Sequence, residues 1–325
     1  MTPSRIVASA PARVDLAGGW TDVAPYTTEL GGAVCNVAIE LRVTVTITPA
    51  GLDFTPPTDP LVRAAWQRAG QPSVAIRLRS DIPIGSGLGG SSAAGVALAA
   101  ALAAARHTSL DSHALAELSR STETETMGLA GGCQDHFAAS FGGALLLHCG
   151  ATTTVDSIVL SDATIAEFES RAMIAFTGES RMSARTITAV IDAYRESDEI
   201  TCASLSTMAA LAPRMADALR DGDIDSLGTL LAHQWTAQRA LHDTITTPLI
   251  DQIVSDVTAA GALGTKALGA SGGGCVLVIA RADRVTEVRE ALARRASLLP
   301  LRVARTGMHL EIHDQADGDC AGGAD

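Results

Sequence analysis

The chain has 325 residues; 47% of them are hydrophobic, 18% are charged, and the formal net charge at pH 7 is −12. This length gives room for two compact domains, and the negative charge excludes nucleic acid and anionic membranes as expected partners. No apolar run is long enough for a membrane span, and residues 1–6 lack a signal-peptide core. We therefore expect a cytoplasmic protein.

The positions of the cysteines and of the lysine limit the kinds of site that the chain can form. The six cysteines are scattered without a C-x-x-C pair, which indicates reduced thiols rather than a disulfide framework or a zinc site. Lys266 is the only lysine and lies beside a glycine cluster. It is therefore a candidate for contact with an anionic substrate, although chance alone would also explain its place.

The first half of the chain alternates between strand and helix patterns. Strands are expected at 7–14, interrupted by Pro11, and at 33–39, 42–47 and 73–78. Helices are expected at 61–69, 93–105 and 111–127. Asp15 and Asp22 flank a glycine-containing turn after the first strand, and from their spacing alone they would be read as an ordinary surface turn.

The stretch at 83–95 is rich in glycine and serine and joins an expected strand to an expected helix. A bare backbone that leads into a helix N-terminus predicts phosphate binding rather than a flexible linker. Gly85, Gly87 and Gly90 also satisfy G-x-G-x-x-G, but Asp111, at the distance expected for the ribose acid, follows no strand. This argues against a dinucleotide-binding fold, and the chain has no Walker sequence.

The second half is mostly helical in pattern. Helices are expected at 182–195, 201–220, 224–241, 248–260 and 283–297, a buried strand at 275–280, and a closing hairpin from 301–305 and 308–312. We predict domains at 1–165 and 166–313, followed by a disordered tail at 314–325.

Three glycine-rich segments occur in the order typical of one enzyme family. Residues 12–22, 83–94 and 266–274 are similar to the first, second and third motifs of the GHMP small-molecule kinases, which include galactokinase, homoserine kinase and mevalonate kinase. The resemblance implies a two-domain α+β fold. Its N-terminal domain would combine a mixed sheet with helices and carry the ATP loop at 83–95, and its C-terminal domain would be helix-rich and ferredoxin-like.

Within this family the chain is similar to the sugar 1-kinase branch. Residues 11–22 and 31–34 resemble fucokinases, whereas residues 131–135, 141–143 and 177–183 resemble heptose 7-phosphate kinases. The resemblance implies ATP- and Mg²⁺-dependent transfer of the γ-phosphoryl group to a sugar hydroxyl, the anomeric C1-OH of a fucose-like sugar or of a heptose 7-phosphate. A cyclitol kinase of a natural-product pathway and a non-catalytic sugar- and ATP-binding sensor stay as alternatives.

The resemblance also implies roles for individual residues. Asp135 matches the general base, and Arg13 would lie beside it and keep it ionised. Glu123 matches the magnesium ligand, and either Ser91 or Ser92 would add a hydroxyl ligand. The residues expected to bind the ATP phosphates are Pro83, Gly85, Ser86, Gly87, Leu88, Gly89, Gly90, Ser91 and Ser92. Without the motifs, Glu123 would be an ordinary helix acid and Asp135 a helix cap.

The acceptor site is implied less sharply. Asp22 matches a carboxylate that accepts hydrogen bonds from sugar hydroxyls. The other residues assigned to the acceptor are Trp20, Gly131, Gly132, Arg181, Gly272 and Gly273. Arg181 would hold a second phosphate if the acceptor is a sugar phosphate. Cys133 stands where heptose kinases often carry a larger residue, which leaves the acceptor open.

Overall fold

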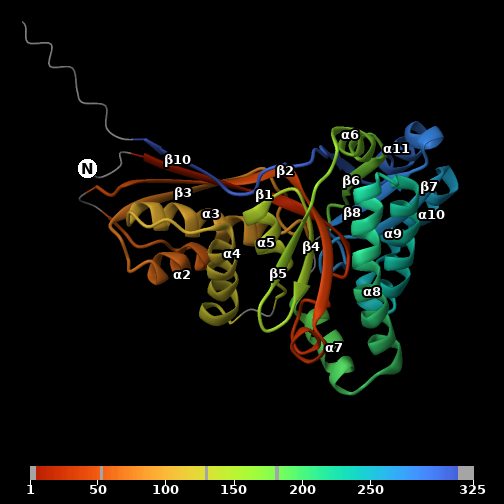
Figure 1. The fold of residues 1–325 in the computed structure, drawn as a ribbon, viewed down its shortest axis with the longest axis horizontal. Helices are drawn as coiled ribbons and strands as arrows, with labels where there is room; N and C mark the ends of the chain where they lie inside the picture. Colours follow the sequence, from red (N-terminus) through yellow and green to blue (C-terminus); the bar gives the residue numbers. More distant parts are fainter. Residues whose placement is uncertain (1–4, 52–53, 129–130, 180–182, 314–325) are drawn as a thin grey trace, which may run out of the picture.

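The computed structural model describes residues 5–51, 54–128, 131–179 and 183–313. Two antiparallel sheets, each covered by helices, lie at opposite ends of an elongated molecule (Figure 1). The six-stranded sheet has the order β10-β1-β2-β4-β5, with β3 paired to β2, and the four-stranded sheet has the order β7-β8-β6-β9. The predicted two-domain α+β fold is confirmed.

The six-stranded sheet is built on two long, bulged strands. Its strands are β1 (Arg5–Ala17), β2 (Gly32–Pro49), β3 (Val74–Ser80), β4 (Ala144–Cys149), β5 (Thr154–Ile158) and β10 (His309–His313). The expected break at Pro11 is wrong, because β1 continues through it with a register shift between Pro11 and Ala12. The two strands expected at 33–39 and 42–47 form one continuous strand, β2, which passes through the same bulge.

The expected closing hairpin is also wrong. The last strand, β10, pairs antiparallel with β1, the first strand of the chain, and Val303 forms an isolated bridge with Ile39. Alternation predicts that a segment is a strand, but the partner of that strand depends on contacts distant in sequence. The division of the chain at about residue 165 stays a prediction, with the qualification that β10 lies in the first sheet.

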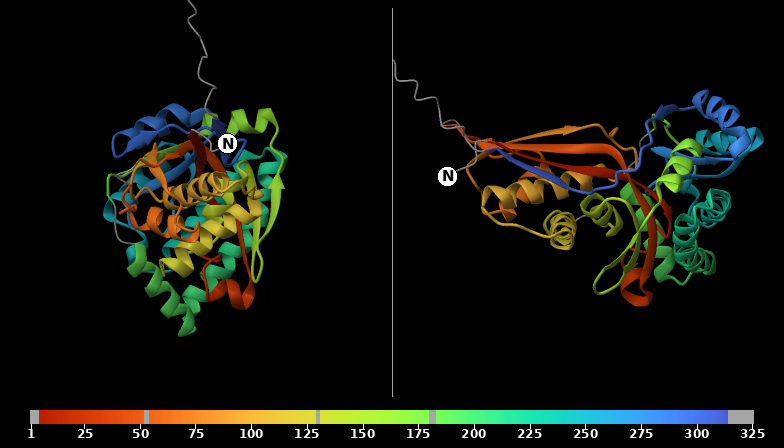
Figure 2. Two further views of the ribbon diagram at one scale, coloured as in Figure 1. Left: turned by 90° about the vertical axis from the view of Figure 1, so that its left-hand side faces the viewer. Right: turned by 45° about the horizontal axis from the view of Figure 1, so that its top comes forward.

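The longer helices of the first half lie against one face of this sheet (Figure 2). They are α2 (Pro60–Arg68), α3 (Gly90–Ala105), α4 (Ser112–Ser121) and α5 (Gln134–Phe141), whereas the short helix α1 (Tyr26–Leu30) lies between β1 and β2 in the chain and packs Tyr26 against Tyr194. Helix α3 is apolar nearly all round because it packs between the sheet and neighbouring helices. The expected helix at 111–127 ends in a π-helical turn, η1 (Thr122–Thr126), a feature often found at functional sites.

The second half combines long helices with short strands. Its elements are α6 (Asp162–Arg171), β6 (Ala172–Phe176), α7 (Ser183–Arg195), α8 (Glu199–Asp221), α9 (Ile224–Arg239), η2 (Asp243–Ile245), α10 (Pro248–Ala260), β7 (Ala262–Ala267), β8 (Cys275–Ala280), η3 (Ala282–Arg284), α11 (Val285–Ala293) and β9 (Ser297–Leu299). The sequence predicted α8, α9, α10 and β8. It missed β6, β7 and β9, because such short runs do not interrupt the helical periodicity around them.

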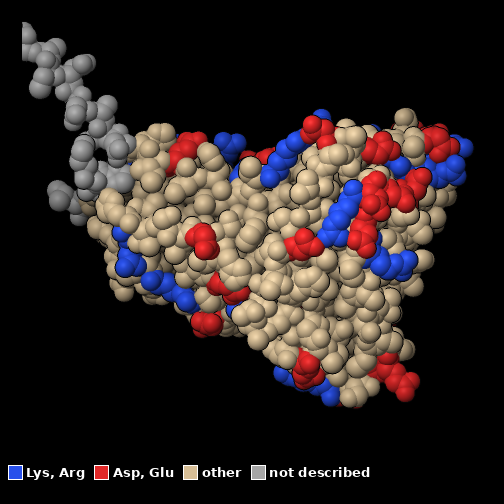
Figure 3. All heavy atoms as spheres, in the orientation of Figure 1, with Lys and Arg blue, Asp and Glu red and all other residues tan. Residues whose placement is uncertain are grey.

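The surface of the molecule carries both signs of charge. On the face shown in Figure 3, acidic and basic side chains are interspersed over the helical end. No helix within the described ranges is both long and apolar enough to cross a membrane. The tail expected to be disordered, residues 314–325, lies outside the described residues.

Candidate functional site

Three segments that are far apart in sequence meet around the buried strand β1. We call residues 83–89 the phosphate loop and residues 268–274 the third loop. Arg13 on β1 donates from Nη1 to the carbonyl oxygen of Gly87 at 2.5 Å. Two residues further along β1, Asp15 accepts from Lys266 Nζ at 2.8 Å, just before the third loop. Strand β1 therefore brings both loops to the first residues of α5.

Arg13 and Asp135 form a close ion pair at the start of α5. Both Nε and Nη2 of Arg13 lie 2.7 Å from Asp135 Oδ1. The Arg13 side chain is 4% exposed, whereas that of Asp135 is 25% exposed, so the carboxylate is the member of the pair that solvent or a ligand can reach. An acid in the first turn of a helix is further stabilised by the helix dipole. The expected contact between these residues is present.

The phosphate loop is rich in glycine and leads directly into the N-terminus of α3. Gly85, Gly87 and Gly89 have φ values of +72°, +72° and +78°. A Cβ atom on Gly87 would lie 2.6 Å from the carbonyl oxygen of Leu268, so the phosphate loop and the third loop touch backbone to backbone. Only glycine meets both requirements, the positive φ and the close approach. The N–H groups at the start of α3 are suited to an anion.

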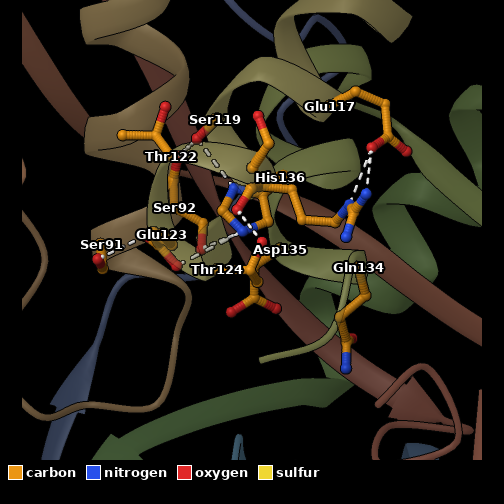
Figure 4. A network of polar contacts seen from close by, with 12 residues as sticks. Ser91, Ser92, Glu117, Ser119, Thr122, Glu123, Thr124, Gln134, Asp135 and His136 are labelled. Carbon is orange, nitrogen blue, oxygen red and sulfur yellow. Dashed lines mark hydrogen bonds and ion pairs between the residues drawn. The ribbon is translucent and has the colours of Figure 1, made fainter. Parts of the chain in front are cut away.

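The two serines that begin α3 have different partners (Figure 4). Ser91 Oγ donates to Glu123 Oε1 at 2.7 Å, whereas Ser92 Oγ lies 3.4 Å from His136 Nε2. Burial raises the pKa of Glu123, and the hydrogen bond from Ser91 opposes this rise. Sequence reasoning left the choice between the two serines open. The two serines differ in their partners, since only Ser91 is hydrogen-bonded to the acid, and the choice of metal ligand between them stays a prediction.

His136 was missed by the sequence analysis, although it directly follows Asp135. Its Nδ1 lies 2.9 Å from Ser119 Oγ and its Nε2 lies 3.5 Å from Glu123 Oε2 (Figure 4). Burial lowers the pKa of His136 to about 3, so the ring is neutral. A proton on Nε2 would then face the Glu123 carboxylate, while Nδ1 accepts from Ser119. His136 therefore packs its ring beside the Glu123 carboxylate.

Glu123 and its neighbours are the candidates for holding a divalent cation. In the part of the chain that the structure describes, no three His, Cys, Asp or Glu side chains converge on a common point. Mg²⁺ does not need such a cluster, because it is commonly held by one or two carboxylates together with phosphate oxygens and water. Glu123 and the Ser91 hydroxyl, next to a phosphate loop, supply hard oxygen donors of this kind.

Asp22 is a buried carboxylate at the exit of the first motif. Its Oδ2 accepts from the backbone N–H of Gln134 at 3.0 Å, and the approach is so close that a Cβ on Gly132 would lie 1.9 Å from this oxygen. Burial raises the pKa of Asp22 to about 6, against the effect of the hydrogen bond from Gln134. The negative charges of Asp135 and Asp15 add to the rise.

This raised pKa predicts how stability depends on pH. Between about pH 4 and pH 6, folded Asp22 holds a proton that the unfolded chain releases, so its contribution to stability is lost as the pH rises. The rise of the pKa from 3.8 to about 6 corresponds to about 3 kcal/mol. Because part of this difference falls below pH 4, we expect the free energy of unfolding of Asp22→Asn, relative to wild type, to increase by about 2 kcal/mol from pH 4 to pH 7. Denaturant titrations would measure it; a difference that is constant with pH would refute the assignment.

A cavity of about 320 Å³ opens beside Asp22. Its wall combines an acid with hydroxyl groups and the ion pair between Glu117 and Arg120, whose closest atoms are 2.8 Å apart. The residues around it are Asp22, Val23, Ala24, Thr27, Thr28, Glu117, Arg120, Thr124, Gly131, Cys133, Cys149, Gly150, Ala151 and Thr153. Hydrogen-bonding groups of this kind suit a polyol.

A second set of polar residues, missed from the sequence, joins the first motif to the third loop. Gln234 Oε1 accepts from the backbone N–H of Gly18 at 3.3 Å. Gln234 in turn donates to Gln238 at 3.4 Å, and Gln238 donates to Ser271 Oγ at 2.8 Å. Both glutamines are fully buried on α9. The signal in the sequence was a pair of glutamines four residues apart within an apolar helical pattern.

The other residues assigned to the acceptor have different surroundings in the structure. Trp20 is buried with φ +81°, and Gly131 borders the cavity. Gly272 donates its N–H to the carbonyl of Ile245, and a Cβ on Gly273 would lie 2.7 Å from the Glu179 carbonyl oxygen. Arg181 lies outside the described residues. The acceptor roles of all these residues stay predictions.

The sequence matches known proteins along most of its length. Residues 60–143 match the family described as GHMP kinases N terminal domain, and residues 215–297 match GHMP kinases C terminal. A galactokinase of Mycobacterium tuberculosis is 30% identical over 88% of this chain and 92% of its own. A D-glycero-alpha-D-manno-heptose 7-phosphate kinase of Campylobacter jejuni is 25% identical over 81% of this chain and 86% of its own.

A third relative and a solved structure extend the comparison. The bifunctional fucokinase/GDP-fucose pyrophosphorylase of Arabidopsis thaliana is 26% identical over 90% of this chain, which spans about a third of that protein, 32%. The crystal structure of a D-glycero-D-manno-heptose 1-phosphate kinase from Bacteroides thetaiotaomicron has a TM-score of 0.75 at 24% identity, covering 94% of this chain and 98% of that chain. This likeness shows a shared fold. With the sequence matches, it establishes that the chain belongs to the GHMP kinase family of phosphotransferases.

Proposed function

We propose that the protein transfers the γ-phosphoryl group of ATP to a hydroxyl of a sugar, with Mg²⁺ as the metal. The observation that carries the proposal is the Arg13–Asp135 ion pair, 2.7 Å long, held by Arg13 against the phosphate loop. The named activities of the relatives support a sugar as the acceptor. A fucose-like sugar or a heptose 7-phosphate, phosphorylated at the anomeric hydroxyl, is the acceptor that we propose.

The nucleotide would lie on the phosphate loop and the N-terminus of α3. The backbone N–H groups there would hold the phosphates by direct hydrogen bonds, and the dipole of α3 would add to the attraction. No lysine would be needed at this site. Ser91 and Glu123 would hold the magnesium ion, and His136 would keep Glu123 turned toward it. ATP would supply the phosphoryl group, and Mg²⁺ would neutralise the negative charge on its oxygens.

Asp135 would act on the acceptor. As a carboxylate with a quarter of its side chain exposed, it can accept the proton of a hydroxyl that attacks the phosphorus atom. Arg13, at 2.7 Å, holds the Asp135 carboxylate in place, and the same guanidinium binds the carbonyl oxygen of Gly87 in the phosphate loop. One arginine thus sets the distance between the base and the nucleotide site.

Asp22 and the cavity beside it would orient the acceptor. The Asp22 carboxylate accepts hydrogen bonds from hydroxyl groups most strongly when it is ionised, which is the case above about pH 6. The wall of the cavity offers further hydroxyl and carboxylate groups for the remainder of a polyol. Because Arg120 is paired with Glu117, this wall carries no unpaired guanidinium among the described residues.

A substrate screen tests the proposal. ADP release would be measured with free sugars, sugar phosphates and cyclitols, each with ATP and Mg²⁺. The proposal requires acceptor-dependent ADP release with at least one sugar or sugar phosphate. Turnover restricted to a cyclitol would replace the sugar by that acceptor class, and nucleotide binding without any transfer would favour a sensor.

The assigned metal ligand gives a separate prediction. We expect Glu123→Gln to raise the Mg²⁺ concentration needed for half-maximal rate by roughly 10- to 100-fold, because a neutral amide is a weaker ligand than a carboxylate. Glu125→Gln is the matched control, since Glu125 lies in the same π-helical turn but pairs at 3.7 Å with Arg68 on the surface. Equal Mg²⁺ dependence of the two variants would show that Glu123 is not a metal ligand.

A further inference from the structure

The only lysine of the chain forms a fully buried ion pair that the proposed mechanism does not use. Lys266 at the end of β7 has an exposed side-chain fraction of 0%, and its Nζ lies 2.8 Å from Oδ2 of Asp15, which is 2% exposed. The two residues are 251 positions apart in sequence and belong to different sheets. A buried pair of this kind usually adds little net stability, so a role in specifying geometry is the more informative hypothesis.

The pair lies next to Arg13 on one face of β1. Arg13 and Asp15 are two residues apart in a stretch where β1 and β2 pair without a register shift, so both side chains point to the same side. Arg13 holds the carbonyl of Gly87 in the phosphate loop, and Asp15 holds Lys266, two residues before Leu268. One strand therefore presents two adjacent anchors, one for each loop.

The two loops are in direct backbone contact at that place. Cys275 donates its N–H to the carbonyl of Ser86 at 2.8 Å. A Cβ on Gly269 would lie 3.0 Å from the Cα of Gly87, and one on Gly274 would lie 2.8 Å from the Ser86 carbonyl oxygen. At such distances a small displacement of the third loop must displace the phosphate loop as well.

We propose that Lys266 is a positioning residue: its ion pair with Asp15 fixes the third loop against the phosphate loop and thereby sets the affinity for the nucleotide. The inference rests on the proposed function, because it assigns the phosphate loop to a nucleotide. Burial lowers the pKa of Lys266 and Asp15 opposes this, so the ammonium depends on its partner. Loss of either partner leaves one buried charge unpaired.

The test compares three variants: Lys266→Met, Asp15→Asn and the double variant that carries both. The single variants separate the two charges, and the double variant removes both, so that no charge is left buried alone. We expect the double variant to regain most of the melting temperature that Lys266→Met loses. We expect it still to bind a non-hydrolysable ATP analogue with Mg²⁺ roughly 10- to 100-fold more weakly than wild type. Arg281→Met, which removes an exposed cation paired with Asp283, is the control.

Hydrogen–deuterium exchange adds a readout that does not depend on catalysis. In the double variant, peptides that contain residues 83–89 and 266–275 should exchange faster than in wild type, while peptides from β4 and α8 should not change. A double variant with wild-type affinity for the analogue and wild-type exchange in both loops would overturn the inference. If wild-type protein itself binds no ATP analogue, the proposed function fails first, and the inference falls with it.

Discussion

Replacement of Asp135 by asparagine should reduce kcat by roughly 10²- to 10⁴-fold and leave the affinity for the ATP analogue within a factor of about three of wild type. Asparagine keeps the size of the side chain but cannot take the proton of the acceptor hydroxyl. The nucleotide contacts that we propose come from the backbone N–H groups of the phosphate loop and α3, and asparagine keeps the side-chain size with which residue 135 packs against Gly89. Steady-state rates and analogue binding would be measured on the same preparation.

Two controls make this result specific. Asp283→Asn removes an exposed carboxylate that pairs with Arg281 at the surface, and it should leave kcat unchanged. Thermal denaturation of Asp135→Asn is needed because Arg13 loses its charged partner, although it keeps the carbonyl of Gly87. A folded Asp135→Asn protein with a kcat close to wild type would show that Asp135 is not the base.

Replacement of Gly87 by alanine should abolish measurable nucleotide binding and lower the free energy of unfolding by about 1–3 kcal/mol. The new Cβ would lie 2.6 Å from the Leu268 carbonyl oxygen, and the residue would have to keep φ at +72°. Both the phosphate loop and the third loop would have to shift to relieve the clash. Calorimetry with the ATP analogue and urea unfolding would measure the two effects.

Gly51→Ala is the matched control for Gly87. A Cβ at Gly51 meets no heavy atom within 4 Å, so alanine should be tolerated there without loss of binding. Retention of wild-type binding by Gly87→Ala would contradict the assignment of this loop to the phosphates, because the substitution cannot leave its backbone in place.

Most of the proposed catalytic centre could be predicted from the sequence, because its parts lie in recognisable motifs. Glycines that need positive φ or close approach leave a clear signal, and so does an acid placed after such a turn. The contact between Arg13 and Asp135, 122 positions apart, followed from the resemblance rather than from spacing. The structure adds the reason for this contact, which is that β1 packs against α5.

The supporting residues could not be predicted in the same way. His136 has no periodic or motif signal, and its role depends on Ser119 and Glu123 being folded against it. The partner of Lys266 is Asp15, at the other end of the chain, and nothing in the local pattern of either residue indicates the other. The same limitation explains why the predicted C-terminal hairpin was wrong, since β10 pairs with β1, the first strand of the chain. Long-range pairing is decided by the packing of the whole fold.

The most direct test of the central claim is ³¹P NMR of a reaction that contains ATP, Mg²⁺ and the acceptor selected by the substrate screen. We predict that a new sugar-phosphate resonance, coupled to the proton of the phosphorylated carbon, grows in step with ADP for wild type and is almost absent for Asp135→Asn. Release of inorganic phosphate with ADP, without a new phosphate ester from any acceptor of the panel, would contradict phosphoryl transfer to a sugar hydroxyl.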